Sequence, residues 1–207
     1  IFFQANQLSQ IIREYFYNPN GVFQGNIFLG DLITGILVSF LVSVVIFGGI
    51  KRIAIVASKM VPIMVGIYLF AAIIVLFKNI QDIPSIFILI ISDAFSGNAV
   101  AGGAIGTVIS IGVRRGLFSN EAGSGTETMA HGAAKTNEPV REGLVAMLGP
   151  LIDTIIVCSI TAFVILLSGV YNQDLNGVSM TVVAFENELG ILGKILIMIA
   201  VITFSLS

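Results

Sequence analysis

Most of this chain consists of apolar segments long enough to cross a lipid bilayer, and this feature restricts the folds open to it. A run of about 20 apolar residues is typical of a transmembrane helix. Six segments fit this description in whole or in part, at about residues 1–12, 32–50, 61–77, 83–113, 144–167 and 191–207. They predict an all-α, polytopic membrane protein. Because the chain begins without methionine and stops inside an apolar run, we expect a single transmembrane domain that is a piece of a longer protein.

The composition agrees with a membrane protein and argues against several functions. Hydrophobic residues make up 56% of the chain and charged residues 11%, against about 25% charged residues in soluble domains. The net charge of −2 and the lack of a basic patch argue against a nucleic-acid partner. Cys158 is the only cysteine, so no disulfide can form within these residues. No nucleophile–base pair is evident, and we expect a protein that is not an enzyme.

The basic residues predict which connections face the cytoplasm. Seven of the ten Lys and Arg residues lie in alternate connections: Lys51, Arg52, Lys59, Arg114, Arg115, Lys135 and Arg141. Cytoplasmic loops of membrane proteins are enriched in Lys and Arg. We therefore expect a multi-pass protein of the plasma (inner) membrane whose loops 51–60 and 114–142 are cytoplasmic.

Two prolines indicate local helix geometry. Pro62 is expected in the first turn of its helix, where a missing N–H costs little. Pro150 lies within the fifth apolar segment. It is expected either to kink that helix or to mark a short segment before it, because proline cannot donate a helical hydrogen bond.

The fourth apolar segment, 83–113, is too long for one straight helix and is interrupted by glycines. These are Gly97, Gly102, Gly103, Gly106 and Gly112. Small residues can serve close helix packing, but polar residues share the region: Asp93, Ser96, Asn98 and Thr107. Irregular backbone at membrane depth is tolerated only where it is buried in protein or lines a cavity. The combination favours an unwound binding site, in which backbone N–H groups at a half-helix start suit a carboxylate.

Other polar residues lie within apolar segments. Gln4 and Gln7 are on the first span, where amides face the bundle interior and bond another helix or a ligand. Asp153, on the fifth span, is a candidate cation ligand, proton carrier or structural hydrogen-bonding group. Ser205 and Ser207 either bond the carbonyl one turn back or ligate a hard cation.

The arginine pair has two interpretations. Arg114 and Arg115 are most simply topology anchors at the end of an apolar segment. Alternatively, one of them, such as Arg115, pairs with Glu121 as the latch of an inner gate.

Several ordered blocks in the chain resemble one known family. They are FQANQ (3–7), DAFSGNAVAGG (93–103), RGLFSNEAG (115–123), AHGAAKT (130–136), PVREG (139–143) and IDTIIVC (152–158). Together they resemble the sodium:alanine (and glycine) symporter family over almost the whole chain. The resemblance implies the inverted-repeat fold of the leucine-transporter type, of which this chain covers the third to the eighth core helix.

The resemblance also implies site residues. Gln4 is expected to face the substrate from the third core helix. Phe95, Gly102 and Gly103 are expected at or near the break of the sixth helix, with Thr107 beside them. Ser207 is expected to contribute to a sodium site on the eighth helix. The first broken helix, which holds the other half of the substrate site, is expected in the remainder of the same polypeptide.

The resulting functional prediction is secondary active symport of a small neutral amino acid, alanine or glycine, with sodium across the plasma membrane. Sodium is then transported rather than held as a prosthetic group, and the partners are the amino acid and the lipid bilayer. Two alternatives remain open. A proton-coupled transporter of the same fold would use an acid such as Asp153 or Asp93, and a channel would show flux without saturation or coupling.

Overall fold

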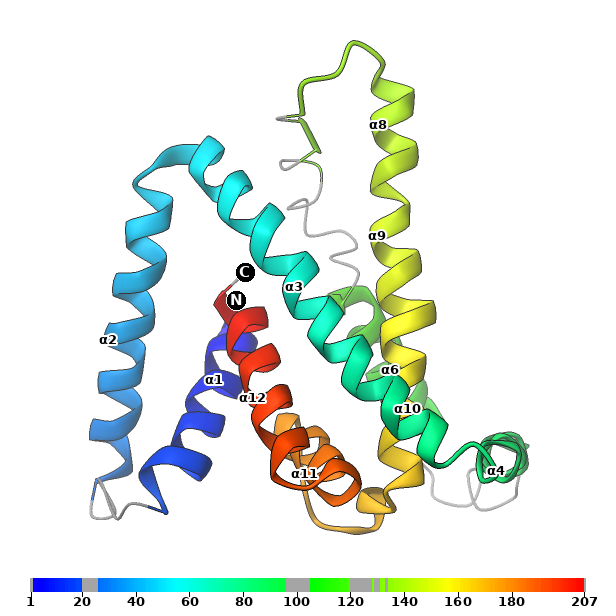
Figure 1. Cartoon of the computed structure of the whole chain (residues 1–207). Helices are drawn as coiled ribbons and strands as arrows, with labels where there is room; N and C mark the ends of the chain where they lie inside the picture. The colour runs from blue at the N-terminus through cyan, green and yellow to red at the C-terminus, as the bar shows by residue number, and fades with distance from the viewer. Residues whose placement is uncertain are drawn as a thin grey trace. The chain divides into compact units, whose positions relative to one another are not determined.

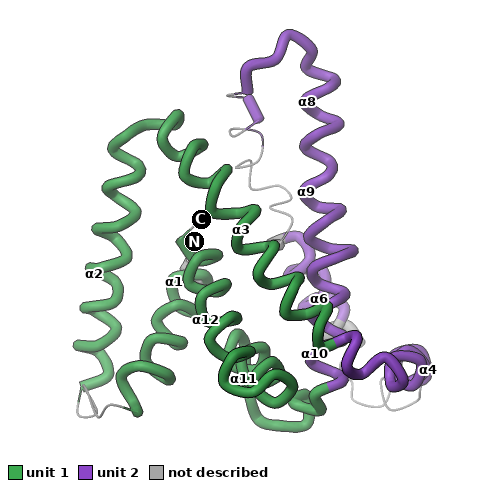
Figure 2. The backbone as a smooth tube through the Cα atoms, viewed as in Figure 1, with its two compact units in different colours: residues 1–75, 168–207 green, residues 76–167 purple. Residues whose placement is uncertain are grey.

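A computed structural model of the chain describes residues 2–19, 26–95, 105–119, 128, 131–132 and 134–206. All regular secondary structure in these residues is helical, and the prediction of an all-α protein is confirmed. The chain divides into two compact units (Figure 2). Unit 1 contains residues 1–75 and 168–207, and unit 2 contains residues 76–167.

Unit 1 combines the first helices of the chain with the last two (Figure 1). Its elements are α1 (Phe2–Ile12), the π-helix η1 (Arg13–Tyr17), α2 (Ile27–Ile46), most of α3 (Gly49–Lys78), the 3-10 helix η3 (Val170–Asn172), α11 (Val178–Leu189) and α12 (Ile191–Leu206). The Asn26 side chain accepts a hydrogen bond from the Leu29 N–H at 3.3 Å and caps α2. Gly49 has φ of 74°, a left-handed conformation that favours glycine between α2 and α3.

The close packing of α11 against α12 forms the centre of unit 1. Gly190, with φ of 67°, ends α11. Gly193 lies so near the backbone carbonyl oxygen of Phe185 that a side chain would not fit. The Phe185 ring is buried and lies 5.7 Å from the Tyr68 ring of α3, centroid to centroid. α1 also packs on α12. The buried apolar residues of α1, α11 and α12 include Leu8, Ile11, Val182, Ala184, Ile197 and Ala200.

Unit 2 contains the fourth apolar segment and the fifth span. Its elements are α4 (Ile83–Phe95), α6 (Ile105–Ser119), α8 (Pro139–Ala146), α9 (Leu148–Leu151), the π-helix η2 (Ile152–Cys158) and α10 (Ser159–Leu167). α4 packs on α10, where the Phe87 and Phe163 ring centroids are 5.4 Å apart, and α6 packs on η2. Pro150 follows a break at Met147, between α8 and α9. The helical stretch continues through Pro150 to Leu167, so neither of the two expectations for this residue is decided.

The structure overturns the first expected loop and shows that both ends of the second are helical. Residues 51–60 form the first part of α3 rather than a loop, and Pro62 lies inside that helix rather than in its first turn. The stretch holds alanine, lysine and arginine, which are good helix formers, so the helix extends beyond the apolar segment. Arg114 and Arg115 likewise belong to α6, and residues 139–142 belong to α8.

α11 lies in a connection for which the sequence predicts no helix. Its 12 residues extend roughly 18 Å at 1.5 Å per residue, too short to cross a bilayer. Val182 and Phe185 are buried, whereas Glu186 and Glu188 are not. This amphipathic pattern explains a helix that lies on other helices rather than spanning the membrane.

The described residues carry the apolar surface of an integral membrane protein. Three helices are long and apolar enough to cross a membrane, Ile27–Ile46, Gly49–Lys78 and Pro139–Leu167. Two shorter apolar helices are Ile83–Phe95 and Ile191–Leu206. Large apolar side chains stay exposed on them, such as Phe28 at 75% and Phe70 at 65%. Such a surface requires an apolar medium or further protein around it.

Candidate functional site

The interruption that the sequence predicts in the fourth apolar segment falls on residues 96–104, which are outside the described residues, and the described parts on either side are helical. α4 ends at Phe95, whose side chain is 87% exposed, and α6 begins at Ile105. Thr107 lies in the first turn of α6, but its side chain is outside the described residues, as are Gly102 and Gly103. A helix break within residues 96–104 would leave backbone groups that can bind a polar ligand or an ion, and this break stays a prediction.

Asp153 lies in an unusual helical turn of the same unit. It is the second residue of the π-helix η2 and is half-buried. π-Helical turns are rare and occur frequently at functional sites. Because α6 packs on η2, Asp153 lies on a direct neighbour of the helix that carries Thr107 and Arg115. Arg115 is exposed, and Glu121 is outside the described residues, so the expected latch stays a prediction.

α1 carries a row of amide and acidic side chains in unit 1. Gln4, Gln7, Gln10 and Glu14 are spaced three, three and four residues apart, which places them along one face of the helix. The Gln7 amide donates to Gln10 Oε1 at 3.4 Å, and the Gln10 amide donates to Glu14 Oε1 at 2.9 Å. Gln4, half-buried, lies one turn before Gln7.

This row is bonded to the first turn of α11. Ser179 Oγ, almost fully buried, donates to Glu14 Oε2 at 2.6 Å and accepts from the Gln10 amide at 2.9 Å. Gln7 Oε1 accepts the Val178 N–H at 2.8 Å. Gln7, Gln10, Glu14 and Ser179 are called the α1–α11 cluster below. A carboxylate at a helix N-terminus also interacts favourably with the helix dipole, so the cluster fixes α11 to α1.

An ion pair and a cation–π contact lie beside the α1–α11 cluster. Lys194 Nζ lies 3.0 Å from Glu186 Oε1 and 4.6 Å from the centre of the Tyr15 ring. Burial raises the pKa of the Tyr15 hydroxyl, and the charges of Glu14 and Glu186 raise it further. Tyr15 therefore stays neutral at physiological pH and offers its ring to the ammonium group. These contacts link η1, α11 and α12.

The whole chain, residues 1–207, matches the sodium:alanine symporter family. The chain belongs to this family. An uncharacterized transporter of Haemophilus influenzae is 44% identical over 77% of the chain. The probable sodium/glutamine symporter GlnT of Bacillus subtilis is 39% identical over 77%, and the sodium/alanine symporter AgcS of Methanococcus maripaludis is 40% identical over 88%. The chain spans 36%, 34% and 41% of the lengths of these three relatives.

The residues expected to bind substrate and sodium in this member of the sodium:alanine symporter family fall on both units. Gln4 belongs to unit 1, whereas Phe95, Thr107 and Asp153 belong to unit 2. Ser207 is outside the described residues. Ser205 Oγ donates to the Val201 carbonyl oxygen at 2.8 Å, as hydroxyls in apolar helices commonly do.

Three residues of the α1–α11 cluster, Gln10, Glu14 and Ser179, were not anticipated in this family member. Glu14 could have been found from its spacing, because it continues the row of glutamines on α1. Ser179 could not, since it lies 165 residues further along the chain and serines are common in connections. The pair of His131 Nδ1 and Glu142 Oε1, 2.7 Å apart in unit 2, was likewise not expected.

Proposed function

We propose that the whole protein performs secondary active symport of a small neutral amino acid, alanine or glycine, with sodium across the plasma membrane. The match of residues 1–207 to the sodium:alanine symporter family carries this proposal. The glycines and polar residues of the fourth apolar segment support it, because transporters bind substrate and ion near the midplane with broken helices.

In this proposal the substrate-binding residues are Gln4, Phe95, Gly102, Gly103 and Thr107. Gln4 offers an amide that can both donate and accept hydrogen bonds to the polar groups of the amino acid. Gly102 and Gly103 allow close approach of the backbone, and the N–H groups before Thr107 suit the substrate carboxylate. Phe95 lies at or near the helix break in this proposal. Ser207 supplies an oxygen ligand to sodium.

Transport follows from coupling between the two sites. Sodium and amino acid each stabilise the state that the other prefers, which is a reciprocal coupling free energy. Joint binding favours closure, and one group of helices then rocks against the other around the bound solutes. A pair of Arg115 and Glu121 would hold the inner gate closed until the substrate is bound.

Proton coupling is the second candidate, and the position of Asp153 favours it. A half-buried carboxylate in a π-helical turn beside α6 could carry a proton. A larger substrate is a variant of the first proposal, since one relative is named a probable sodium/glutamine symporter. A tight pocket discriminates against it, because each extra methylene costs about 1–3 kcal/mol.

Uptake of labelled alanine by the full-length protein in proteoliposomes tests these proposals. At constant pH, an inward sodium gradient is expected to accelerate alanine uptake over a choline gradient, and sodium is expected to raise the affinity for alanine about 5–150-fold, the range of typical coupling free energies. Unlabelled glycine is expected to compete better than glutamine. Uptake that ignores sodium but follows a pH gradient, and that Asp153→Asn abolishes, would support proton coupling. Flux that does not saturate would indicate a channel.

A further inference from the structure

The first part of α3, just after the turn from α2 (Figure 1), carries a basic face without acidic partners. Lys51, Arg52 and Lys59 are exposed there. At 3.6 residues per turn the three positions lie within about 100° of one another around the helix axis. No Asp or Glu occurs from residue 32 to 81. Within the part of the chain that the structure describes, the three side chains have no ion pair or hydrogen bond. We call these three residues the α3 basic face.

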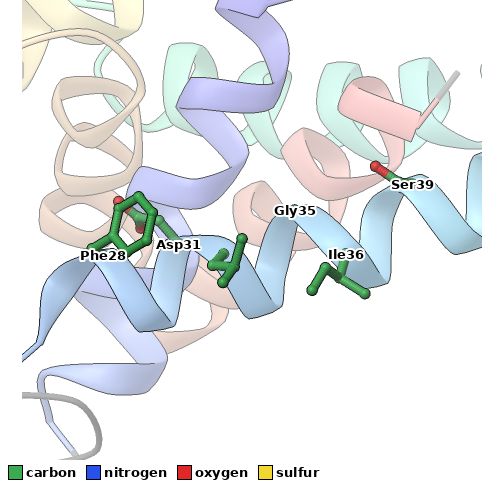
Figure 3. Close-up of a pocket in the computed structure, with 6 residues that line it drawn as sticks. Phe28, Asp31, Gly35, Ile36 and Ser39 are labelled. Atoms are coloured by element: carbon green, nitrogen blue, oxygen red, sulfur yellow. The ribbon is translucent and has the colours of Figure 1, made fainter.

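Helix lengths place the α3 basic face at the level of lipid headgroups. α2 has 20 residues and extends about 30 Å, the thickness of the hydrocarbon core of a bilayer. Its apolar side chains are exposed, with Phe28 at 75% and Ile36 at 62% (Figure 3). α3 has 30 residues and extends about 45 Å, roughly 15 Å more than that core. Because the apolar part of α3 begins near Val61, the excess falls at the end that carries the basic face.

Apolar side chains lie beside the α3 basic face in the sequence. Phe47 is 89% exposed and Ile50 is 57% exposed. The aliphatic part of the Arg52 side chain lies directly over Gly48, where an added side chain would not fit, so Arg52 folds back over the turn between the two helices. Exposed apolar side chains next to cationic groups are typical of segments at a membrane interface, where the first contact acyl chains and the second contact headgroups.

We infer that the α3 basic face binds the phosphate group of an anionic phospholipid, while Phe47 and Ile50 contact its acyl chains. Guanidinium and ammonium groups donate charge-assisted hydrogen bonds to phosphate oxygens. A zwitterionic lipid carries a cation of its own, which offsets the attraction. A free phosphate would leave the exposed apolar side chains in water. The depth at which the helix lengths place the face favours a lipid over a water-soluble acidic protein.

Photolabelling of the full-length protein in nanodiscs tests this inference. The probe is phosphatidylglycerol with a diazirine near its headgroup, compared with phosphatidylcholine that carries the same diazirine at the same mole fraction. Residues 46–59 are expected to gain at least about ten times more adduct from the anionic probe, since each basic residue at an anionic surface contributes roughly a fivefold preference. Equal labelling by the two lipids, or no labelling of this stretch by either, overturns the inference.

A double variant with a matched control separates the α3 basic face from general charge. Arg52→Gln with Lys59→Gln is expected to lower the preference to about fivefold or less, because one basic residue of the face remains. The control, Lys135→Gln with Arg141→Gln, removes two exposed basic residues from a connection that also holds acidic ones such as Glu138. It is expected to keep the preference of the parent at residues 46–59. An equal loss in both double variants contradicts the inference.

Salt and a soluble competitor provide an independent check. The Debye length falls from about 10 Å at 0.1 M ionic strength to about 3 Å at 1 M, so 1 M sodium chloride is expected to reduce the preference at least about twofold. Millimolar glycerol phosphate is expected to leave the labelling unchanged, because the acyl chains hold the lipid headgroup at a high local concentration. A preference that ignores salt, or one that glycerol phosphate abolishes, rules the lipid site out.

Discussion

At the scale of single residues, Ser179 shows how one hydroxyl can join two distant parts of the chain. It is 4% exposed and bonds both Gln10 and Glu14, which lie more than 160 residues earlier. In a site of low dielectric constant such bonds are strong, and a lost partner is costly. The α1–α11 cluster is therefore the polar contact on which the docking of α11 depends.

Replacing Ser179 by alanine is expected to destabilise the protein. The change leaves the Gln10 amide and the Glu14 carboxylate each short of a partner, which costs about 1–3 kcal/mol. The measurement is the thermal midpoint of the full-length protein in detergent. Ser58→Ala is the matched control, because the Ser58 hydroxyl is exposed and bonds only the carbonyl of Ile55 in its own helix. Its effect is expected to stay within about 0.5 kcal/mol. Equal midpoints for both variants would show that the cluster does not hold α11.

Only part of the α1–α11 cluster could be predicted from the sequence. The amides Gln4 and Gln7 stand out because they interrupt an apolar segment. Their partners do not, since the contact between α1 and α11 depends on how the chain folds back after about 170 residues. The roles of Gln4, Phe95 and Thr107 in substrate binding rest on the family resemblance and stay predictions.

At the scale of helices, the pair α11 and α12 depends on the absence of one side chain. A Cβ atom on Gly193 would meet the carbonyl oxygen of Phe185 and the Cβ atom of Leu189. The carbonyl belongs to the backbone of α11 and cannot rotate away as a side chain would. The two helices can therefore approach this closely only with glycine at position 193.

Gly193→Ala is expected to push α11 and α12 apart and to destabilise the protein by about 1–3 kcal/mol, the usual cost of overpacking. Urea or thermal unfolding in detergent measures this change. Gly66→Ala serves as the control, because a Cβ atom there meets nothing within 4 Å and alanine favours the helix. A Gly193→Ala variant as stable as the control would mean that the close contact is absent.

Helix bounds show what the apolar pattern can and cannot predict. The pattern predicts an all-helical membrane protein, because lipid requires long apolar helices. It misplaces the start of α3, which begins at Gly49 rather than near Val61. Hydropathy indicates which residues suit a lipid environment, and a helix can extend beyond them. It also misses α11, whose polar face hides a buried row around Phe185.

At the scale of the whole molecule, the two units carry different parts of the proposed mechanism. Unit 1 holds Gln4 and the α1–α11 cluster, and unit 2 holds the fourth apolar segment and Asp153. Symport requires that binding at one place changes affinity at another. The central claim is that sodium and amino acid move together, and it concerns the complete polypeptide rather than either unit.

The most direct test asks whether a gradient of alanine can move sodium across the membrane. Full-length protein in proteoliposomes receives an inward alanine gradient, with equal concentrations of radioactive sodium inside and outside and the membrane potential clamped. Because coupling is reciprocal, symport predicts that alanine entry carries labelled sodium inward. The sodium concentration inside then rises above the concentration outside, although the two were equal at the start. Symport also predicts that accumulation stops when alanine is equal on both sides. Alanine entry that leaves sodium at equilibrium would contradict the account.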